Sequence, residues 1–431
     1  MIKPKVVEKS GSKVIEAVNS TSETFYGWWI VCTGIVIMFI ASGIGFYGHG
    51  VILDPLRESH GWSKGLISSA ITFYFFISAV IGVFAGKTID RFGSKPVLVF
   101  GSICMGLGLI LLSVISEVWQ LYGVYFLMAV GFSCTSLLPV NALITNWFIR
   151  KRGLTMSLTM TGLSLGGIFI VPAATFMIAK WGIKETLPIL GVLYWLIIPV
   201  SIIFIKQRPQ DLNQLPDGCL EKDDSSRPVK SSLSLESQMR VWTVKQAMGT
   251  LTFWSIVITF MLALGSQIAF CVHQVSFLGK YLGLTGAALA VSITAGASII
   301  GRLILGQVID RYDNRKVMML CLVSQAIAVL TLAYNQHIVI LYMGTLIFGL
   351  TMGSILMMQS LIVGECFGVV SFGTVSGIAG LFSGAGAAFG PTIAGVIFDA
   401  TQSYRQAFIL FAAASAIATF TIYFAKPPKT V

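Results

Sequence analysis

The sequence predicts an all-α membrane protein of twelve transmembrane helices, arranged as two similar six-helix bundles. Of its 431 residues, 55% are hydrophobic and only 11% are charged, whereas about 25% of an ordinary globular chain is charged. The mean hydropathy is +0.83, and apolar stretches recur from Tyr26 almost to the last residue. A soluble domain of this size has too little interior to hide that much apolar surface. A polytopic membrane protein is therefore expected.

Twelve apolar runs are long enough to cross the hydrocarbon core, which takes about 20 residues per helix. The predicted spans are 26–50, 63–86, 96–116, 119–147, 152–179, 185–205, 250–279, 284–309, 316–334, 337–365, 371–398 and 405–425. The segment 206–249 carries both charges with several Ser and Pro, so it is too polar for lipid and is expected to be a linker. The expected order is an N-terminal tail (1–25), a six-helix bundle (26–205), the linker (206–249), a second bundle (250–425) and a C-terminal tail (426–431).

Basic residues in the loops indicate the orientation of the bundle. They gather at one end, as Lys87, Arg91, Lys95, Arg150, Lys151, Arg152, Arg311, Arg315, Lys316, Lys426 and Lys429. The positive-inside rule places this end, with both termini and the linker, in the cytoplasm of a cell whose inner or plasma membrane the chain spans. Because these residues lie in short loops, the net charge of +11 does not indicate a nucleic-acid partner. The cysteines form no CxxC pair, and neither a metal nor a cofactor is expected.

An internal repeat relates the two halves. Gly86–Lys95 matches Gly306–Arg315 at a shift of 220 residues. At a shift of 219 residues, Ser157, Ser164, Gly167 and Pro172 match Ser376, Ser383, Gly386 and Pro391. Two tandem parallel repeats place a substrate site between the halves near the bilayer midplane. A site completed within one chain requires only a monomer.

These motifs resemble those of a known family. The segment Gly86–Lys95 resembles the cytoplasmic loop signature of the major facilitator superfamily, and Gly306–Arg315 resembles its usual copy in the second half. Asn146–Gly162 is similar to the fifth-helix signature of the monocarboxylate porters, and Tyr26–Trp29 to their first-helix opening. The resemblance covers nearly the whole chain and points to the branch of monocarboxylate porters and oxalate–formate exchangers. It implies a transporter rather than an enzyme.

The repeated loops suggest a cytoplasmic gate. Asp90 and Arg91 in the first half and Asp310 and Arg311 in the second can pair across the ends of neighbouring helices and hold one conformation shut. The alternative is that these charges serve only as topology determinants and helix caps.

Arg302 is the only basic residue predicted to lie well inside a span. It precedes Asp310 by eight residues, about 12 Å along a helix, where half the hydrocarbon core is about 15 Å. A buried arginine needs a cavity or a partner, and the sequence supplies no acid at comparable depth. An anionic substrate is therefore the expected counter-ion, and the planar guanidinium suits a carboxylate. Snorkelling to the cytoplasmic face is the alternative. Porters of the branch that this chain resembles also carry an arginine in their eighth helix.

The number of fixed positive charges suggests the charge of the substrate. Some dianion exchangers of the branch carry a second basic residue in helix eleven, at or beside Ser376 here, and that span holds no Lys, Arg or His. A dicarboxylate would leave one negative charge uncompensated in a low-dielectric site. A monoanionic carboxylate is the better match.

Two histidines are candidates for proton coupling. Mammalian-type porters, which this chain resembles, carry a lysine near the end of helix one and an acid one turn before the arginine, where this chain has His49 and Ser298. His49 could accept a proton near neutral pH, or it could be an ordinary interfacial histidine. His273, in the outer part of the seventh span, is the second candidate.

Neutral polar residues at the depth of the cavity complete the expected site. They are Tyr74, Asn141, Gln267 and Ser383, whose hydroxyl or amide groups could bind the carboxylate or a substrate hydroxyl. Hydrogen bonding between helices is the alternative role.

The expected function is secondary active transport of small monocarboxylates such as lactate or pyruvate, by alternating access and coupled to protons in symport. The alternatives are a carboxylate exchanger of the oxalate–formate type and a non-transporting carboxylate sensor on the same fold. An intramembrane enzyme is not expected, because the sequence shows no nucleophile–base pair or metal cluster at depth.

Overall fold

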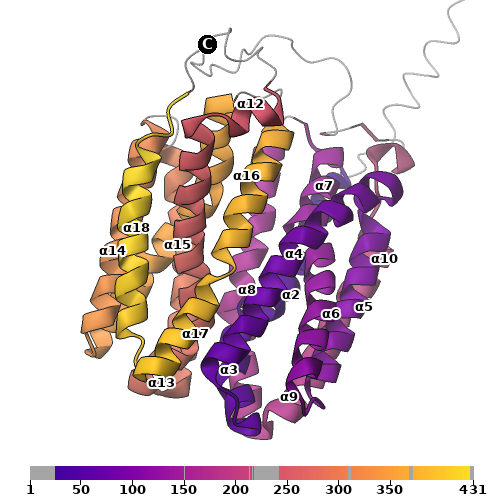
Figure 1. The fold of residues 1–431 in the computed structure, drawn as a ribbon. Helices are drawn as coiled ribbons and strands as arrows, with labels where there is room; N and C mark the ends of the chain where they lie inside the picture. The colour runs from indigo at the N-terminus through magenta and orange to yellow at the C-terminus, as the bar shows by residue number, and fades with distance from the viewer. Residues whose placement is uncertain are drawn as a thin grey trace, which may run out of the picture.

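The protein is all helical in the part of the chain that the structure describes (Figure 1). This computed structural model describes residues 25–149, 151–212, 214, 215, 217, 242–308, 312–367 and 372–427. Among these residues, eleven segments are long and apolar enough to cross a membrane. One of them contains two crossings, so the prediction of twelve spans is confirmed.

The first half of the chain makes six crossings. Its helices are α2 (Gly27–Gly45), α3 (Gly48–His60), α4 (Lys64–Phe92), α5 (Ser94–Leu112), α6 (Val118–Thr135), α7 (Leu137–Trp147), α8 (Arg152–Trp181), α9 (Ile183–Trp195) and α10 (Ile197–Phe204). Three crossings are interrupted helices, in which α2 continues as α3, α6 as α7 and α9 as α10.

The second half follows a short 3₁₀ turn, η1 (Pro209–Leu212), and makes six more crossings. Its helices are α12 (Val244–Met248), α13 (Leu251–Val308), α14 (Asn314–Tyr334), α15 (Ile338–Phe367), α16 (Phe372–Ala387), α17 (Gly390–Thr401) and α18 (Arg405–Ile422). Most of the predicted linker 206–249 lies outside the described residues.

Helix α13 holds two antiparallel spans that reverse at Gly283. This glycine has φ +69°, a left-handed conformation that other residues rarely adopt. Gln274 Nε2 donates to Thr294 Oγ1 at 2.8 Å, although twenty residues of straight helix would separate them by about 30 Å. The two arms therefore lie side by side, as the predicted spans 250–279 and 284–309 require.

The first crossing is longer than the sequence suggested. The predicted span ended at residue 50 and placed Asp54 in an outer loop, but α3 continues to His60, where Gly61 (φ +70°) caps it. The expectation was wrong because charged residues normally mark a loop. Here the Asp54 carboxylate is paired with Lys64 at 2.8 Å, which lowers the cost of carrying a charge on a packed helix.

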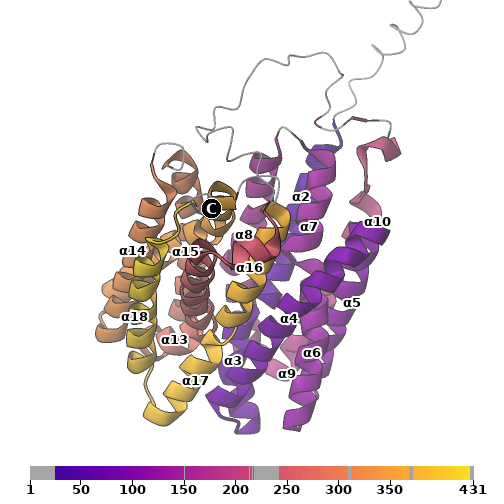
Figure 2. The ribbon, with the colours of Figure 1, turned by 45° about the horizontal axis from the view of Figure 1, so that its top comes forward.

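The helices of the two halves form separate groups that meet along two seams, α8 with α13 and α4 with α17 (Figures 1 and 2). We call the end of the bundle that carries Phe25 and residue 427 the terminal end, and the opposite end the far end. One hydrogen bond between the halves joins Lys64, at the far end, to Tyr404. Another joins Arg302 to the Met160 carbonyl. Alternating access requires such seams to open and close about a central site.

Small residues allow the close packing that positions Arg302. A Cβ on Gly353 of α15 would lie 1.9 Å from the carbonyl oxygen of Ser298, one turn before Arg302. In the first half, a Cβ on Gly162 of α8 would lie 2.3 Å from the carbonyl oxygen of Ile35. The hydrophobic effect does not drive helices together inside a bilayer, so membrane helices associate through close contacts of this kind.

Candidate functional site

Three helices are interrupted near the middle of the bundle, and the interruptions face one cavity. Beyond α2, the N–H groups of Phe46 and Tyr47 both donate to the Ser42 carbonyl at 2.9 Å. Helix α6 gives way to α7 at Ser136, whose backbone is extended (φ −84°, ψ −151°). Helix α16 ends at Ala387, before α17 begins. Interrupted helices commonly build transporter sites at this depth.

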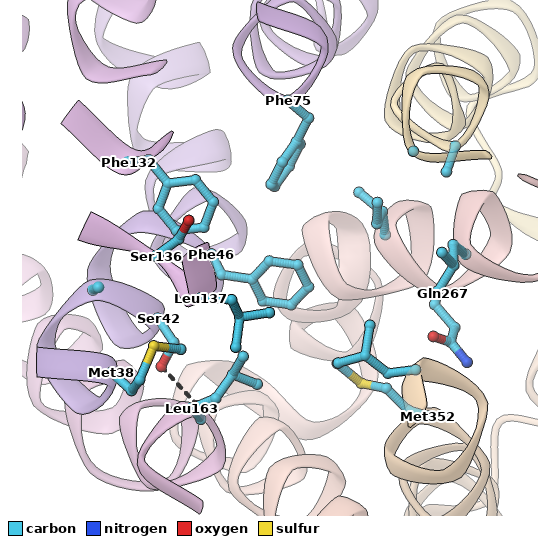
Figure 3. A pocket seen from close by; sticks show the side chains of 16 residues that line it. Met38, Ser42, Phe46, Phe75, Phe132, Ser136, Leu137, Leu163, Gln267 and Met352 are labelled. Atoms are coloured by element: carbon cyan, nitrogen blue, oxygen red, sulfur yellow. Dashed lines mark hydrogen bonds between the residues drawn. The ribbon is translucent and has the colours of Figure 1, made fainter. Parts of the chain in front are cut away.

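The cavity lies between the two halves and has a volume of about 230 Å³. The rings of Phe46, Phe75 and Phe132 face it from the first half, with Gln267 and Met352 on the opposite side (Figure 3). Its walls come from α2, α4, α6, α7 and α8 on one side and from α13, α15 and α16 on the other. Contributions from both halves are what a site between repeats requires.

Few polar groups reach this cavity. Ser42 lines it, but its hydroxyl donates to the Leu163 carbonyl at 2.7 Å. Gln267 also lines it, and its Nε2 donates to Gln325 Oε1 at 2.8 Å. Gln325 in turn donates to Ser415 Oγ at 3.0 Å. The wall is therefore mainly apolar. The Gln267 amide is held in place by Gln325, which is itself bonded to Ser415 inside the second half.

Arg302 lies behind the turn of α8 that lines the cavity. It is buried, and its guanidinium donates to the Met160 carbonyl at 3.2 Å and to the Ser164 hydroxyl. Ser164 also hydrogen-bonds Ser298 at 2.8 Å, while the neighbouring Leu163 lines the cavity. Within the described residues, the structure gives Arg302 no carboxylate partner. Two neutral acceptors leave most of the five guanidinium N–H groups for other partners.

Tyr47 packs beside the part of α13 that leads to this arginine, and it was not among the residues predicted from the sequence. A Cβ on Gly167 would lie 3.0 Å from the Tyr47 ring and 2.9 Å from Ala295, one turn from Ser298. The Tyr47 hydroxyl is buried without a hydrogen-bond partner. The available signal was a tyrosine at the glycine-rich end of an apolar run, two residues before His49.

His49 and Tyr74 lie together in an aromatic cluster beside the cavity. The His49 ring is 4.5 Å from the Tyr74 ring and 5.7 Å from the Tyr125 ring, centroid to centroid. Both ring nitrogens are buried without a well-oriented hydrogen-bond partner. Tyr74 donates its hydroxyl to the Gly45 carbonyl at 2.8 Å. Neither residue lines the cavity, and Phe75, in contact with both rings, separates them from it.

His273 joins the two halves nearer the far end. One ring nitrogen lies 3.0 Å from the Tyr404 hydroxyl, and the other lies 3.1 Å from the Pro391 carbonyl and 3.3 Å from Ser68 Oγ. Ser68 belongs to the first half and the other three residues to the second. Both ring nitrogens are thus occupied, unlike those of His49.

A polar network extends from His273 to the far end of the bundle. Its members, here called the Lys64 network, are Asp54, Lys64, His273, Ser276, Asp399 and Tyr404. Lys64 Nζ bonds Ser276 and, at 3.2 Å, the Tyr404 hydroxyl. The carboxylate of Asp399 accepts the backbone N–H groups of Lys64 at 3.1 Å and Gly65 at 2.6 Å, so a second-half residue caps the first turn of α4.

The other two predicted contacts lie away from the cavity wall. Ser383 on α16 accepts a hydrogen bond from Gln359 Nε2 at 2.7 Å and donates to the Ala379 carbonyl at 2.8 Å. Asn141 is half-buried on α7 and does not line the cavity. Of the four neutral candidates, only Gln267 reaches the wall.

The predicted cytoplasmic gate lies largely outside the described residues. This holds for Asp310, Arg311 and the side chain of Asp90. Arg91 is exposed in the last turn of α4, with its guanidinium 5.1 Å from the Phe92 ring centroid. The gate therefore remains a prediction.

The second copy of the repeated loop ends in an ion pair. Arg315 lies 2.7 Å from the carboxylate of Asp313, which also accepts the Arg315 backbone N–H and caps α14. The hydrogen bond from the Arg315 guanidinium lowers the pKa of the Asp313 carboxyl below its usual value.

Comparison with known proteins matches both halves. A family model described as the Major Facilitator Superfamily covers residues 35–270 and 247–431. The chain is 25% identical over 395 residues to the MFS-type transporter pynF of Aspergillus niger, covering 89% of this chain and 84% of the relative. It is 21% identical over 455 residues to monocarboxylate transporter 7 of Homo sapiens, covering 94% and 87%. It is 24% identical over 182 residues to the oxalate:formate antiporter of Oxalobacter formigenes, covering 42% and 43%.

The fold also matches solved structures. A bacterial homologue of the human lysosomal transporter Spinster, in an inward-facing and unoccupied conformation, superposes with a TM-score of 0.71 at 13% identity, covering 94% of this chain and 98% of that one. This likeness shows the fold, in which two six-helix bundles surround a central cavity. The chain belongs to the Major Facilitator Superfamily, as the repeated loop motif indicated.

Proposed function

We propose that this protein is a secondary active transporter of small monocarboxylate anions, of the lactate and pyruvate type, working by alternating access. The proposal rests on the surroundings of Arg302. This buried cation lies behind the cavity wall, and its partners in the described residues are neutral. A buried cation is costly unless a partner or cavity compensates it. A carboxylate that takes the place of Ser164 would supply the missing charge.

The charge balance favours a substrate with a single carboxylate. No basic side chain lines the cavity in the described part of the chain, and Arg302 is the buried cation that bonds Ser164, the neighbour of the lining residue Leu163. Neutral donors nearby, such as the Tyr47 hydroxyl, can hydrogen-bond a carboxylate without adding charge. The resemblance to monocarboxylate transporter 7 supports this class of substrate.

Proton symport is the proposed mode of coupling, and His49 is the preferred carrier. Its ring nitrogens have no well-oriented hydrogen-bond partner, and its ring contacts Phe75 of the cavity wall. His273 is the second candidate, although its existing hydrogen bonds would have to break for it to bind a proton on both nitrogens. We place the protein in the inner or plasma membrane as a monomer, with both termini in the cytoplasm and the gate of Asp90, Arg91, Asp310 and Arg311 at that side.

Anion exchange is the second candidate function, and Ser298 favours it. Related porters carry an acid at this position, whereas Ser298 here hydrogen-bonds Ser164 beside Arg302. Since Arg302 has no carboxylate partner among the described residues, the protein would change between its inward-open and outward-open states only with an anion bound. The similarity to an oxalate:formate antiporter over part of the chain is consistent with exchange.

Transport by purified protein in proteoliposomes tests the proposal. We expect uptake of labelled lactate or pyruvate, accelerated by an inward proton gradient with no internal anion. Arg302→Ala should reduce uptake at least 100-fold and Arg302→Lys less, while Arg405→Ala, an exposed arginine stacked on Tyr334, serves as the control. Normal uptake by Arg302→Ala would show that Arg302 does not bind the substrate. If uptake occurs only when an anion is present inside the proteoliposomes, the protein is an exchanger and not a symporter.

A further inference from the structure

The size of the central cavity bears on the size of its ligand. Its volume is about 230 Å³, whereas an apolar protein cavity of about 150 Å³ is enough to hold benzene, with six carbon atoms. By proportion, this cavity accommodates about nine carbon-sized atoms. A two- or three-carbon acid would leave much of it unfilled, and unfilled apolar space forfeits contacts on every side.

The chemistry of the walls also favours an apolar ligand body. Three phenylalanine rings face Ile268, Met352 and Leu356 across the cavity. The Ser42 hydroxyl and Gln267 Nε2 donate to other protein groups, and Ser136 is the third polar residue of the wall. A hydroxylated or strongly hydrated body would lose water here with little to replace it. Aromatic and methionine side chains instead suit flat or branched hydrocarbon groups.

The charged end of the ligand is placed by Arg302. Leu163 lines the cavity, and its neighbour Ser164 is bonded to the guanidinium. A carboxylate at this edge would exchange the Ser164 hydroxyl for a charge-assisted bond to Arg302. The rest of the molecule would then extend between the phenylalanine rings of the first half and the aliphatic wall of the second.

We infer that, among the monocarboxylates proposed above, those with a bulky apolar body, such as arylalkyl or branched aliphatic acids, bind more tightly than lactate or pyruvate. The inference rests on the proposed function, since it assigns the carboxylate to Arg302. It adds that the cavity selects by hydrophobic volume.

Ligand binding to the full-length protein in detergent tests the inference. The probes are acetate, pyruvate, butanoate, hexanoate and 3-phenylpropanoate, with 3-phenylpropanol as the uncharged partner of the last. We expect Kd to fall about fourfold for each added methylene, to be lowest for 3-phenylpropanoate, and to rise at least tenfold for the alcohol.

The possible results separate the two proposals. Arg302-dependent binding that favours acetate or pyruvate, or that ignores chain length, overturns the inference and leaves monocarboxylate transport standing. Equal binding of 3-phenylpropanol and 3-phenylpropanoate overturns both. Absence of binding by every carboxylate also overturns both.

Two glycine variants on α16 test whether the cavity is the part of the protein that selects ligands by size. Gly384 lines the cavity, and a Cβ there has no neighbour within 4 Å, so Gly384→Leu adds side-chain volume at the cavity wall and introduces a better helix former. It should weaken 3-phenylpropanoate at least tenfold more than pyruvate. Gly377→Leu, an exposed and equally unobstructed position on the same helix, should leave both affinities unchanged. Equal weakening of both ligands by Gly384→Leu contradicts selection by volume.

Discussion

Lys64 and Arg302 are both buried cations in the helical bundle, but their surroundings differ. Lys64 is 4% exposed and Arg302 is 8% exposed. Lys64 Nζ lies 2.8 Å from the carboxylate of Asp54 and 4.2 Å from the centre of the Phe398 ring. Arg302 donates to the carbonyl of Met160 and the hydroxyl of Ser164, which are neutral. The protein therefore neutralises one cation itself and leaves the other without a counter-charge in its described part.

The difference follows from where each cation lies. Lys64 belongs to the network that joins the halves at the far end, where a compensated ion pair with further hydrogen bonds can hold one conformation. Arg302 lies beside the cavity, where an unneutralised cation can receive a mobile anion. Lys64 thus has a structural role at the far end of the bundle, and Arg302 has a proposed binding role near the cavity.

The largest expected effect comes from removing the carboxylate of Asp54. Asp54→Asn leaves Lys64 buried without its ion-pair partner, which should lower the free energy of unfolding by about 2 kcal/mol, less than for a fully buried pair, because the Asp54 side chain is 33% exposed. The midpoint of thermal unfolding in detergent measures this loss. Adding Lys64→Met to the same chain should recover most of it, because the stranded charge is then removed. A double variant as unstable as the single one would show that the pair is not the cause.

Arg302→Met should behave in the opposite way. Removing a cation that has no carboxylate partner among the described residues should change the stability of the ligand-free protein by less than about 1 kcal/mol. Stabilisation by added monocarboxylate should disappear. If this variant unfolds as readily as Asp54→Asn, Arg302 is a structural cation like Lys64 and the contrast between the two fails.

Ser164→Ala tests the bond that an anion would replace. Removing this neutral acceptor should destabilise the ligand-free arrangement of Arg302 by about 1 kcal/mol and so tighten carboxylate binding about fivefold. Thr159→Ala is the matched control, since Thr159 is buried on the same helix and donates to the Thr155 carbonyl of its own turn. Weaker binding in Ser164→Ala would instead show that the Ser164 hydroxyl contacts the substrate.

The smallest effect is expected at the exposed pair of Asp313 and Arg315. The guanidinium lowers the pKa of the Asp313 carboxyl, so the pair stabilises the fold above the unfolded carboxyl pKa of about 3.9. This contribution is lost as the pH falls below that value. Since the Asp313 side chain is 34% exposed, we expect it to be below 1 kcal/mol. Asp313→Asn should lack this part of the acid dependence when unfolding midpoints at pH 6 and pH 3.5 are compared.

Much of the fold was predictable from the sequence because a bilayer restricts the choices. Apolar runs must form helices when no water can satisfy their backbone groups, and the repeated Gly86–Lys95 motif related the two halves. The interruptions at Phe46, Ser136 and Ala388 were not predicted. Each lies inside a continuous apolar run, so hydropathy has no means of detecting it.

The candidate site was harder to predict than the fold. Depth alone identified Arg302, since a charge far from both ends of a span is conspicuous in any apolar run. Depth could not distinguish Gln267, which lines the cavity, from Ser383, which bonds Gln359 inside the second half. It also placed Asp54 in a loop, because its partner Lys64 is on another helix.

The sequence by itself determined the class of protein, the number of spans and the identity of the deepest charge, because these depend on composition and on position along one helix. Only the tertiary structure decided which charge is neutralised, which histidine is free and what lines the cavity. Those properties depend on distances between helices that are far apart in the sequence. Hydropathy measures the preference of each segment for lipid, whereas Asp54 and Lys64, or Arg302 and Ser164, meet only when the helices pack.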